Sequence, residues 1–347
     1  MLLRDDFTFS LNLQMTILLD SVYVYFMKIF AFILAFTFAI SQFACGADFL
    51  IPEKPMKLAG IAGRFDFMSS DPVSAKIIAA HVGAKSVEVI DTKTGLVTSL
   101  HVGSAQGVAV DSKNHKFFSG NGNEHKVVIM SSDSMTKLSE VKLSGPVDAI
   151  AFDLKNEMIY AAEDDGSQVW VIDPKSSKLV TTIKIPGIPE VLDYDLASDS
   201  LYLNLKNRDS VLKINPAKNT VEANWSTLPA KLPHGLAIDT KRGWVFVAGA
   251  NGKLVSLDIM SGKLISSVSI VEGADQIAYD EQVNVIYSAC QGFVSVTRVT
   301  DAGLEAIGEI VSPKGAHTLA LDRNSHDVWI SYSDLKFSYL QKFKPAL

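Results

Sequence analysis

Seven residues that recur at a nearly constant interval carry most of the chemistry that this sequence offers. The intervals between them are 40, 42, 42, 44, 41 and 42 residues. Six of the seven are Asp, Glu or His. The 347 residues include 38 acidic residues and 7 histidines, so only about one in seven would be expected by chance. The set consists of Asp66, Gln106, Asp148, Glu190, His234, Asp275 and His317.

Such side chains exchange protons and bind cations. If four carboxylates converge, they cannot all stay ionised cheaply unless a cation or the two histidines offset their charge. Carboxylates with imidazoles are ligands of Ca²⁺, Zn²⁺ or Mn²⁺, and one such divalent cation is the only cofactor that the sequence suggests. Its predicted ligands are Asp148, Glu190, His234, Asp275 and His317. A hydrated, purely structural polar ring explains the same residues without any ligand.

Short strands must position these residues. Five residues after each of them comes an aspartate, and the residues one and three before this aspartate are mostly apolar. The residue two before it is small in six copies, and only Asp193 breaks that column, where it needs a partner if it is buried. This alternation indicates a β-strand. The repeated aspartates are Asp71, Asp111, Asp153, Asp195, Asp239, Asp280 and Asp322.

A second strand follows a polar turn, and its residue seven after the aspartate is aromatic in six of the seven copies. Two further strands follow, for example 169–173 and 179–185. Four strands in each repeat of about 42 residues predict an all-β, seven-bladed β-propeller over residues 48–347, in which the seven chemical positions meet at one mouth of the central channel. The last copy lacks a fourth strand, so we expect the N-terminal segment 56–61 to complete it and close the ring.

A second set of polar residues ends the second strand, which runs back toward the same mouth. His81, Asn121 and Glu163 come from adjacent repeats and are predicted to enlarge the ligand site on one side. Arg64 precedes Asp66 and is predicted to pair with a carboxylate or an anionic ligand. Cys290 ends a strand beside small residues, which favours a buried, inert thiol.

The repeats resemble a known family. Val87-Glu88-Val89-Ile90-Asp91 and the segment 168–173 match the core of the YVTN-repeat β-propellers, and the segments 63–68 and 146–150 are similar to exported bacterial members. The resemblance covers residues 54–347 and implies the propeller fold. It implies little about activity, because propellers host many unrelated functions.

The N-terminus predicts export. Lys28 is followed by an apolar run, 29–43, and then by small residues, so residues 1–47 read as a signal peptide. Residues 1–26 carry acidic residues that do not suit such a signal, and Met27 is an alternative start. The mature chain is therefore expected in the periplasm or outside the cell, without a transmembrane span. The alternatives are an uncleaved anchor that runs from about Thr16 and lipid anchoring at Cys45.

The sequence leaves two functions open. One is a binding or scaffold module for an envelope protein or a small ligand, supported by the lack of a recognised catalytic motif. The other is a metal-dependent hydrolase or lyase of the lactonase kind, with Asp148, Glu190 and Asp275 on the cation and His234 or His317 as general base. The net charge of −6 argues against nucleic-acid binding.

Overall fold

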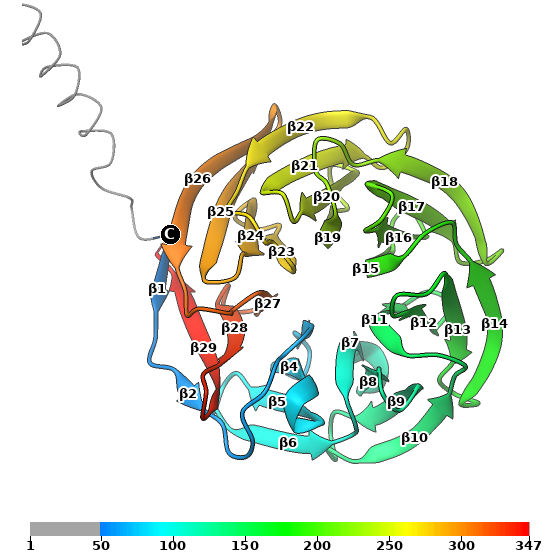
Figure 1. Cartoon of the computed structure of the whole chain (residues 1–347), viewed down its shortest axis with the longest axis vertical. Helices are drawn as coiled ribbons and strands as arrows, with labels where there is room; N and C mark the ends of the chain where they lie inside the picture. The colour runs from blue at the N-terminus through cyan, green and yellow to red at the C-terminus, as the bar shows by residue number, and fades with distance from the viewer. Residues whose placement is uncertain (1–48, 347) are drawn as a thin grey trace, which may run out of the picture. The chain divides into compact units, whose positions relative to one another are not determined.

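Seven antiparallel sheets stand in a ring around a central axis in the computed structural model, which describes residues 49–346 (Figure 1). Each sheet is one blade, and the blades follow one another in chain order. The all-β, seven-bladed prediction is confirmed. The predicted signal peptide, the alternative start Met27 and Cys45 lie outside the described residues. Within residues 49–346, no helix is long and apolar enough to cross a membrane.

The innermost strands of blades 1 to 7 end at the repeated aspartate or, in blade 7, just before it. They are β3 (Met68–Asp71), β7 (Ala105–Asp111), β11 (Val147–Asp153), β15 (Pro189–Asp195), β19 (Pro233–Asp239), β23 (Ile277–Asp280) and β27 (Thr318–Leu321). The second strands are β4 (Lys76–His81), β8 (Lys116–Asn121), β12 (Met158–Glu163), β16 (Ser200–Leu205), β20 (Trp244–Gly249), β24 (Val285–Ala289) and β28 (Val328–Ser333).

The third strands are β5 (Ser86–Asp91), β9 (Lys126–Ser131), β13 (Gln168–Asp173), β17 (Ser210–Asn215), β21 (Lys253–Asp258), β25 (Phe293–Thr300) and β29 (Ser338–Pro345). The outermost strands of blades 1 to 6 are β6 (Val97–His101), β10 (Lys137–Lys142), β14 (Lys178–Lys184), β18 (Thr220–Ser226), β22 (Leu264–Ser269) and β26 (Gly303–Val311). Two 3-10 turns, η2 (Val82–Ala84) and η3 (Ser112–Asn114), complete the elements.

The core lies between neighbouring blades. The second and third strands have both faces covered, so their apolar residues are almost fully buried, whereas an outermost strand such as β18 alternates between half-buried and exposed positions. The residue seven after the aspartate, aromatic in six of the seven blades, is buried in every blade. These residues are Ile78, Phe118, Tyr160, Tyr202, Phe246, Tyr287 and Trp329.

The repeated aspartates lock the blades together at their turns. Each accepts hydrogen bonds from backbone N–H groups two or three residues later, as Asp153 does from Lys155 and Asn156. Several also accept a bond from the next blade: the Ser112 hydroxyl donates to Asp71 at 2.7 Å. This double role gives a physical reason for the strict recurrence of the aspartate.

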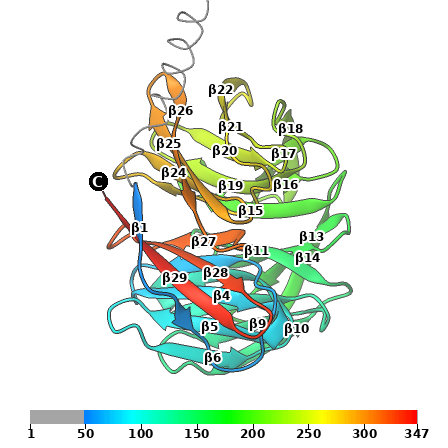
Figure 2. The same cartoon turned by 60° about the vertical axis from the view of Figure 1, so that its left-hand side comes forward.

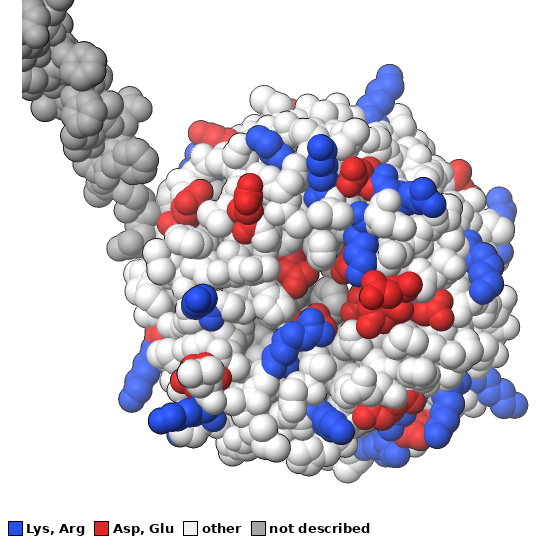
Figure 3. Space-filling view, in the orientation of Figure 1, with Lys and Arg blue, Asp and Glu red and all other residues white. Residues whose placement is uncertain are grey.

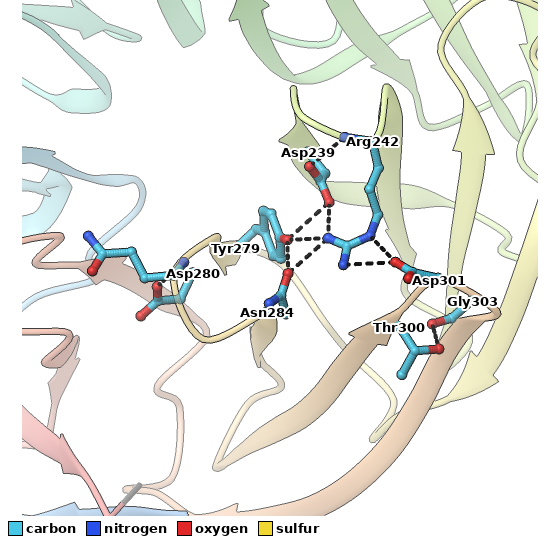
Figure 4. A network of polar contacts seen from close by, with 9 residues as sticks. Asp239, Arg242, Tyr279, Asp280, Asn284, Thr300, Asp301 and Gly303 are labelled. Carbon is cyan, nitrogen blue, oxygen red and sulfur yellow. Dashed lines mark hydrogen bonds and ion pairs between the residues drawn. The ribbon is translucent and has the colours of Figure 1, made fainter.

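The most elaborate of these turns joins blades 5 and 6 (Figure 4). The Arg242 guanidinium donates to Asp239 at 2.9 Å and to Asn284 at 2.8 Å, and its other nitrogens reach Asp301 at 3.3 Å. The Tyr279 hydroxyl donates to the same Asp239 carboxylate at 3.0 Å. Because the carboxylate is buried, this set of donors supplies the charge pairing that burial requires.

The N-terminal segment closes the ring, as predicted. β1 (Leu50–Pro52) and β2 (Met56–Lys57) both pair antiparallel with β29, so blade 7 contains strands from both ends of the chain (Figures 1 and 2). Leu50 pairs with Pro345 and Met56 with Leu340. The contact begins earlier than the predicted segment 56–61, and residues 58–61 are not part of a strand.

Candidate functional site

Contacts and charge effects between blades connect the seven residues that were predicted to line one channel mouth, and we call them the mouth ring. In blades 2 to 5 the pairing of the innermost strand is interrupted at the ring residue, for example between Val147 and Ile150. Such a bulge turns a side chain away from the face it would otherwise occupy. In blades 1 and 6, Asp66 and Asp275 precede the strand and are held by single backbone bonds to Ala80 and Ala289.

Charges from separate blades act on one another in the ring. Burial raises the pKa of Asp66 to about 7 against the opposing charge of Arg64, and the negative charges of Asp275 and Glu190 contribute to the rise. Asp66, Asp148 and Glu190 are 6–7% exposed. In Figure 3 acidic side chains gather around the centre of the face drawn, with basic side chains between them.

Three ring carboxylates have a cationic partner. The Arg64 guanidinium lies 2.7 Å from Asp66, so Arg64 pairs with a carboxylate, as predicted. The arginine side chain is 58% exposed. Nδ1 of His317 lies 2.6 Å from an Asp275 oxygen. Burial is the largest effect and lowers the pKa of His317, but the hydrogen bond to Asp275 and the charges of Asp275 and Asp66 together outweigh it, and the net direction is upward.

The third partner is Lys206, which the sequence analysis missed. Its Nζ lies 2.6 Å from Glu190 and 3.0 Å from Asp165. It comes from the turn after β16, outside the columns of the repeat. His234 lies farther from Glu190, at 3.9 Å, and its Nδ1 is 2.7 Å from the Leu232 carbonyl oxygen, which can only accept. That contact places the proton on Nδ1 and leaves Nε2 toward the ring.

Asp148 is different, because within residues 49–346 it forms no ion pair. Its polar contact is the Gln106 amide, whose Nε2 lies 3.4 Å from Asp148 and 3.3 Å from Asp164. Burial raises the pKa of Asp148 well above its usual range, and the charges of Asp66, Glu190 and Asp164 raise it further. The ring therefore contains one buried carboxylate that forms no ion pair with a described residue, although the charge of Lys206 acts on it against the rise of the pKa.

The second predicted column does not reach the mouth. His81 is fully buried: Nδ1 is 3.0 Å from Glu88, Nε2 is 2.9 Å from the Ser338 hydroxyl of blade 7, and the ring stacks on Phe65 at 4.0 Å. The reason is that side chains of a second strand point at the neighbouring blades, not along the axis. His81 therefore joins blades 1 and 7.

Asn121 and Glu163 are likewise turned to local partners. Asn121 is fully buried and donates from Nδ2 to the Val102 carbonyl at 2.7 Å. Glu163 accepts bonds from the Ser167 amide at 3.1 Å and the Gln168 side chain at 3.0 Å. Cys290, predicted to be an inert thiol, is buried, and burial raises its thiol pKa to about 11.

A cavity of about 360 Å³ opens beside the mouth ring, between blades 7 and 1. The sequence analysis did not identify it, because the turn 333–337 that forms one wall belongs to no column of the repeat. Arg64 and His317 line it together with polar and apolar groups of blade 7. The blade 7 residues in its lining include Ser331, Tyr332, Asp334 and Leu335.

The predicted metal centre is not assembled. Among the described residues, no group of three or more His, Cys, Asp or Glu side chains is placed to hold a metal ion. Of the five predicted ligands, Glu190 is paired with the Lys206 cation, and the two predicted ligands Asp275 and His317 contact each other.

Removing the charge of Asp148 is expected to stabilise the fold at pH 8. The pKa of this group is higher in the folded chain than its value of about 3.9 in an unfolded chain. The folded state therefore binds more protons, and stability is lost as the pH rises from about 4 through the raised pKa. Thermal melts of Asp148→Asn should show a Tm increase of about 2–4 °C at pH 8, equivalent to roughly 1 kcal/mol, and none at pH 3.5. A lower Tm at pH 8 would contradict this prediction.

Comparisons with known proteins show the fold and leave the family open. No protein-family model matches the chain, and no curated sequence matches it. Among solved structures, it is similar to a chain of the Kuenenia stuttgartiensis hydrazine synthase, at 13% identity and a TM-score of 0.72, covering 84% of this chain and 97% of that one. It is also similar to a chain of the mitotic checkpoint complex, at 13% identity and a TM-score of 0.73, covering 84% of this chain and 91% of that one.

The WD40 repeats of RRP9 are a third similar structure, at 10% identity and a TM-score of 0.71, covering 84% of this chain and 97% of that chain. Identities this low carry no information about a shared activity or ligand. The comparisons and the arrangement of the strands support the same conclusion: the chain has the fold of a seven-bladed β-propeller.

Proposed function

We propose that this protein is a non-enzymatic binding module whose mouth ring accepts a cationic group of a partner, such as a Lys or Arg side chain. The observation that carries the proposal is Asp148, a buried carboxylate at a channel mouth without a cationic partner among the described residues. The mouth offers convergent titratable groups in a concave place, which is the usual setting of a binding site.

The balance of charge favours a cation over an anion. Arg64, Lys206 and His317 each already pair with a ring carboxylate, and Asp164 and Asp165 add negative charge at the rim. An incoming ammonium or guanidinium would pair with Asp148 and relieve the repulsion among the acids. Functional sites often contain residues that lower the stability of the fold, as this buried carboxylate does.

The experiment is a calorimetric titration of residues 48–347 with the peptide acetyl-Gly-Gly-Arg-Gly-Gly-amide and with its Glu counterpart. The Arg peptide is expected to bind and the Glu peptide to bind at least tenfold more weakly. Asp148→Asn is expected to raise the Kd of the Arg peptide about tenfold or more, which is roughly 1.4 kcal/mol for a partly desolvated charge pair. Binding should also weaken with added salt.

A matched control is Glu281→Gln, which removes one negative charge at an exposed residue in the turn after β23. It is expected to leave the Kd unchanged. Equal affinity of the two variants would show that net charge alone attracts the peptide and would overturn the proposal. Preferential binding of the Glu peptide would overturn it as well.

The metal-dependent hydrolase remains the alternative prediction from the sequence, and one observation favours catalysis: the His317–Asp275 pair lies beside the cavity, where an imidazole held by a carboxylate could act as a base. Elemental mass spectrometry and a lactone hydrolysis assay of the same preparation test it. About one metal per chain together with hydrolysis that His317→Asn abolishes would replace the binding proposal.

The membership in the YVTN-repeat family and the export of the chain belong to this proposal too. They are supported by the strand motif at 87–91 and by the apolar run at 29–43. A partner in the bacterial envelope, bound through a basic segment, would be consistent with both. Determining the N-terminal residue of the protein recovered from the periplasm would test the predicted cleavage near residue 47.

A further inference from the structure

The central channel holds a second candidate site, below the mouth ring. It forms a cavity of about 480 Å³, within the range of cavities that bind small molecules. The innermost strands of all seven blades make its wall, and most of the side chains that line it are aliphatic or aromatic, although polar groups contribute about half of the exposed lining. At the position two before the repeated aspartate, the wall carries Ser69, Ala109, Ala151, Ala237, Ala278 and Ala320 in six blades.

Blade 4 breaks this wall of small residues with Asp193. The side chain lines the cavity, and the residue is exposed to water there. Its one hydrogen-bond donor among the described residues is the backbone N–H of Tyr194, at 2.8 Å. Burial raises the pKa of Asp193 to about 6, so the group is mainly ionised at neutral pH.

Two other charges act on Asp193. Arg323, in the turn after β27, lines the same cavity and opposes the rise of the pKa, while Asp195 on the same strand adds to it. Neither forms an ion pair with Asp193 in the described part of the chain. The partner that Asp193 would need if it were buried is therefore not supplied by an ion pair, although Arg323 lies in the same cavity.

We propose that the channel binds a small amphipathic amine, with its apolar chain along the alanine wall and its ammonium group on Asp193. A cavity with a wall of alanines and one carboxylate selects such a ligand in two ways. The wall removes hydrocarbon from water, and the carboxylate provides the charged partner that a buried ammonium requires. An uncharged ligand would leave Asp193 without a partner, and a carboxylic acid would meet like charge.

The test compares n-hexylamine with 1-hexanol by ligand-detected NMR on residues 48–347 at pH 7. The wild type is expected to bind the amine at least tenfold more tightly than the alcohol. Asp193→Ala places in blade 4 the residue that five other blades have, so the fold tolerates it. This variant is expected to bind the amine at least tenfold more weakly than the wild type does, and to bind the alcohol with the same or higher affinity. Equal amine affinity in Asp193→Ala, or no amine binding to the wild type, would overturn the proposal.

Two further variants locate the ligand. Ala237→Leu narrows the channel and should lower the affinity for both compounds. Unchanged affinity would mean that the ligand binds elsewhere and would overturn the proposal. Asp193→Ala should bind the Arg peptide as the wild type does, which separates this site from the proposed partner site. The amine should also bind about tenfold more weakly at pH 5 than at pH 7, because Asp193 becomes protonated, and this dependence should vanish in Asp193→Ala.

Discussion

Deleting residues 49–58 is expected to lower the free energy of unfolding by about 5 kcal/mol or more. The deletion removes Leu50 and Leu58, which are 1% and 5% exposed, and each buried leucine contributes about 2–5 kcal/mol. It also leaves an edge of β29 without its backbone partners in β1 and β2. Urea unfolding followed by tryptophan fluorescence, with residues 48–347 as reference, measures the loss.

Two neighbouring substitutions keep this prediction testable if the shortened chain does not fold. Leu50→Ala is expected to cost about 2–4 kcal/mol, because the side chain is enclosed by the core between blades 6 and 7. Ile51→Ala is the matched control, since Ile51 is 51% exposed, and it should change stability by less than about 0.5 kcal/mol. Equal and small effects of the two variants would show that the N-terminal strand does not hold the ring together.

Replacing His81 with alanine is expected to destabilise the protein by about 3–5 kcal/mol. The variant leaves the Glu88 carboxylate, which is 2% exposed, without its imidazole partner, and removing one member of a buried polar pair is costly. It also removes the bond to Ser338 and the stacking on Phe65, so the joint between blades 1 and 7 loses both its polar and its apolar contacts. Urea unfolding gives the difference directly.

The same variant distinguishes a structural from a functional His81. Under conditions where it remains folded, His81→Ala should bind the Arg peptide as the wild type does, because the imidazole lies inside the blades. His115→Ala, at a half-exposed imidazole on a turn, should change stability by less than about 0.5 kcal/mol. If the His81 variant had normal stability but did not bind the peptide, His81 would belong to the ligand site, as the sequence predicted.

The sequence predicted the parts of the molecule that repeat, because repetition in space requires repetition in the chain. The aspartate turns, the aromatic column and the convergence of Asp66 with the other ring residues all follow from stacking one unit seven times. The closure by the N-terminal segment was also predictable, because the last repeat lacked a strand. The absence of a fourth strand from the last repeat was therefore as informative as the strands that the other repeats contain.

The parts that differ from blade to blade could not be predicted. Lys206 and Asp165 belong to turns, where no neighbouring strand fixes the residue type, and no column marked them as members of the site. His81 did stand in a column, but the end of a strand near the mouth says nothing about the direction of its side chain. That direction depends on which neighbouring blade covers it, here through Ser338, 257 residues away.

Because β1 pairs with β29, the ring can close only when synthesis of the chain is nearly complete. The first strand leaves the ribosome before any of its partners exists, and its partner strand is among the last to appear. Until then the chain is an open arc with one unfinished blade, and long-range pairing of this kind forms slowly. The first strand of a neighbouring copy satisfies the same pairing, so crowded nascent chains risk exchanging their first strands and emerging as interlocked dimers.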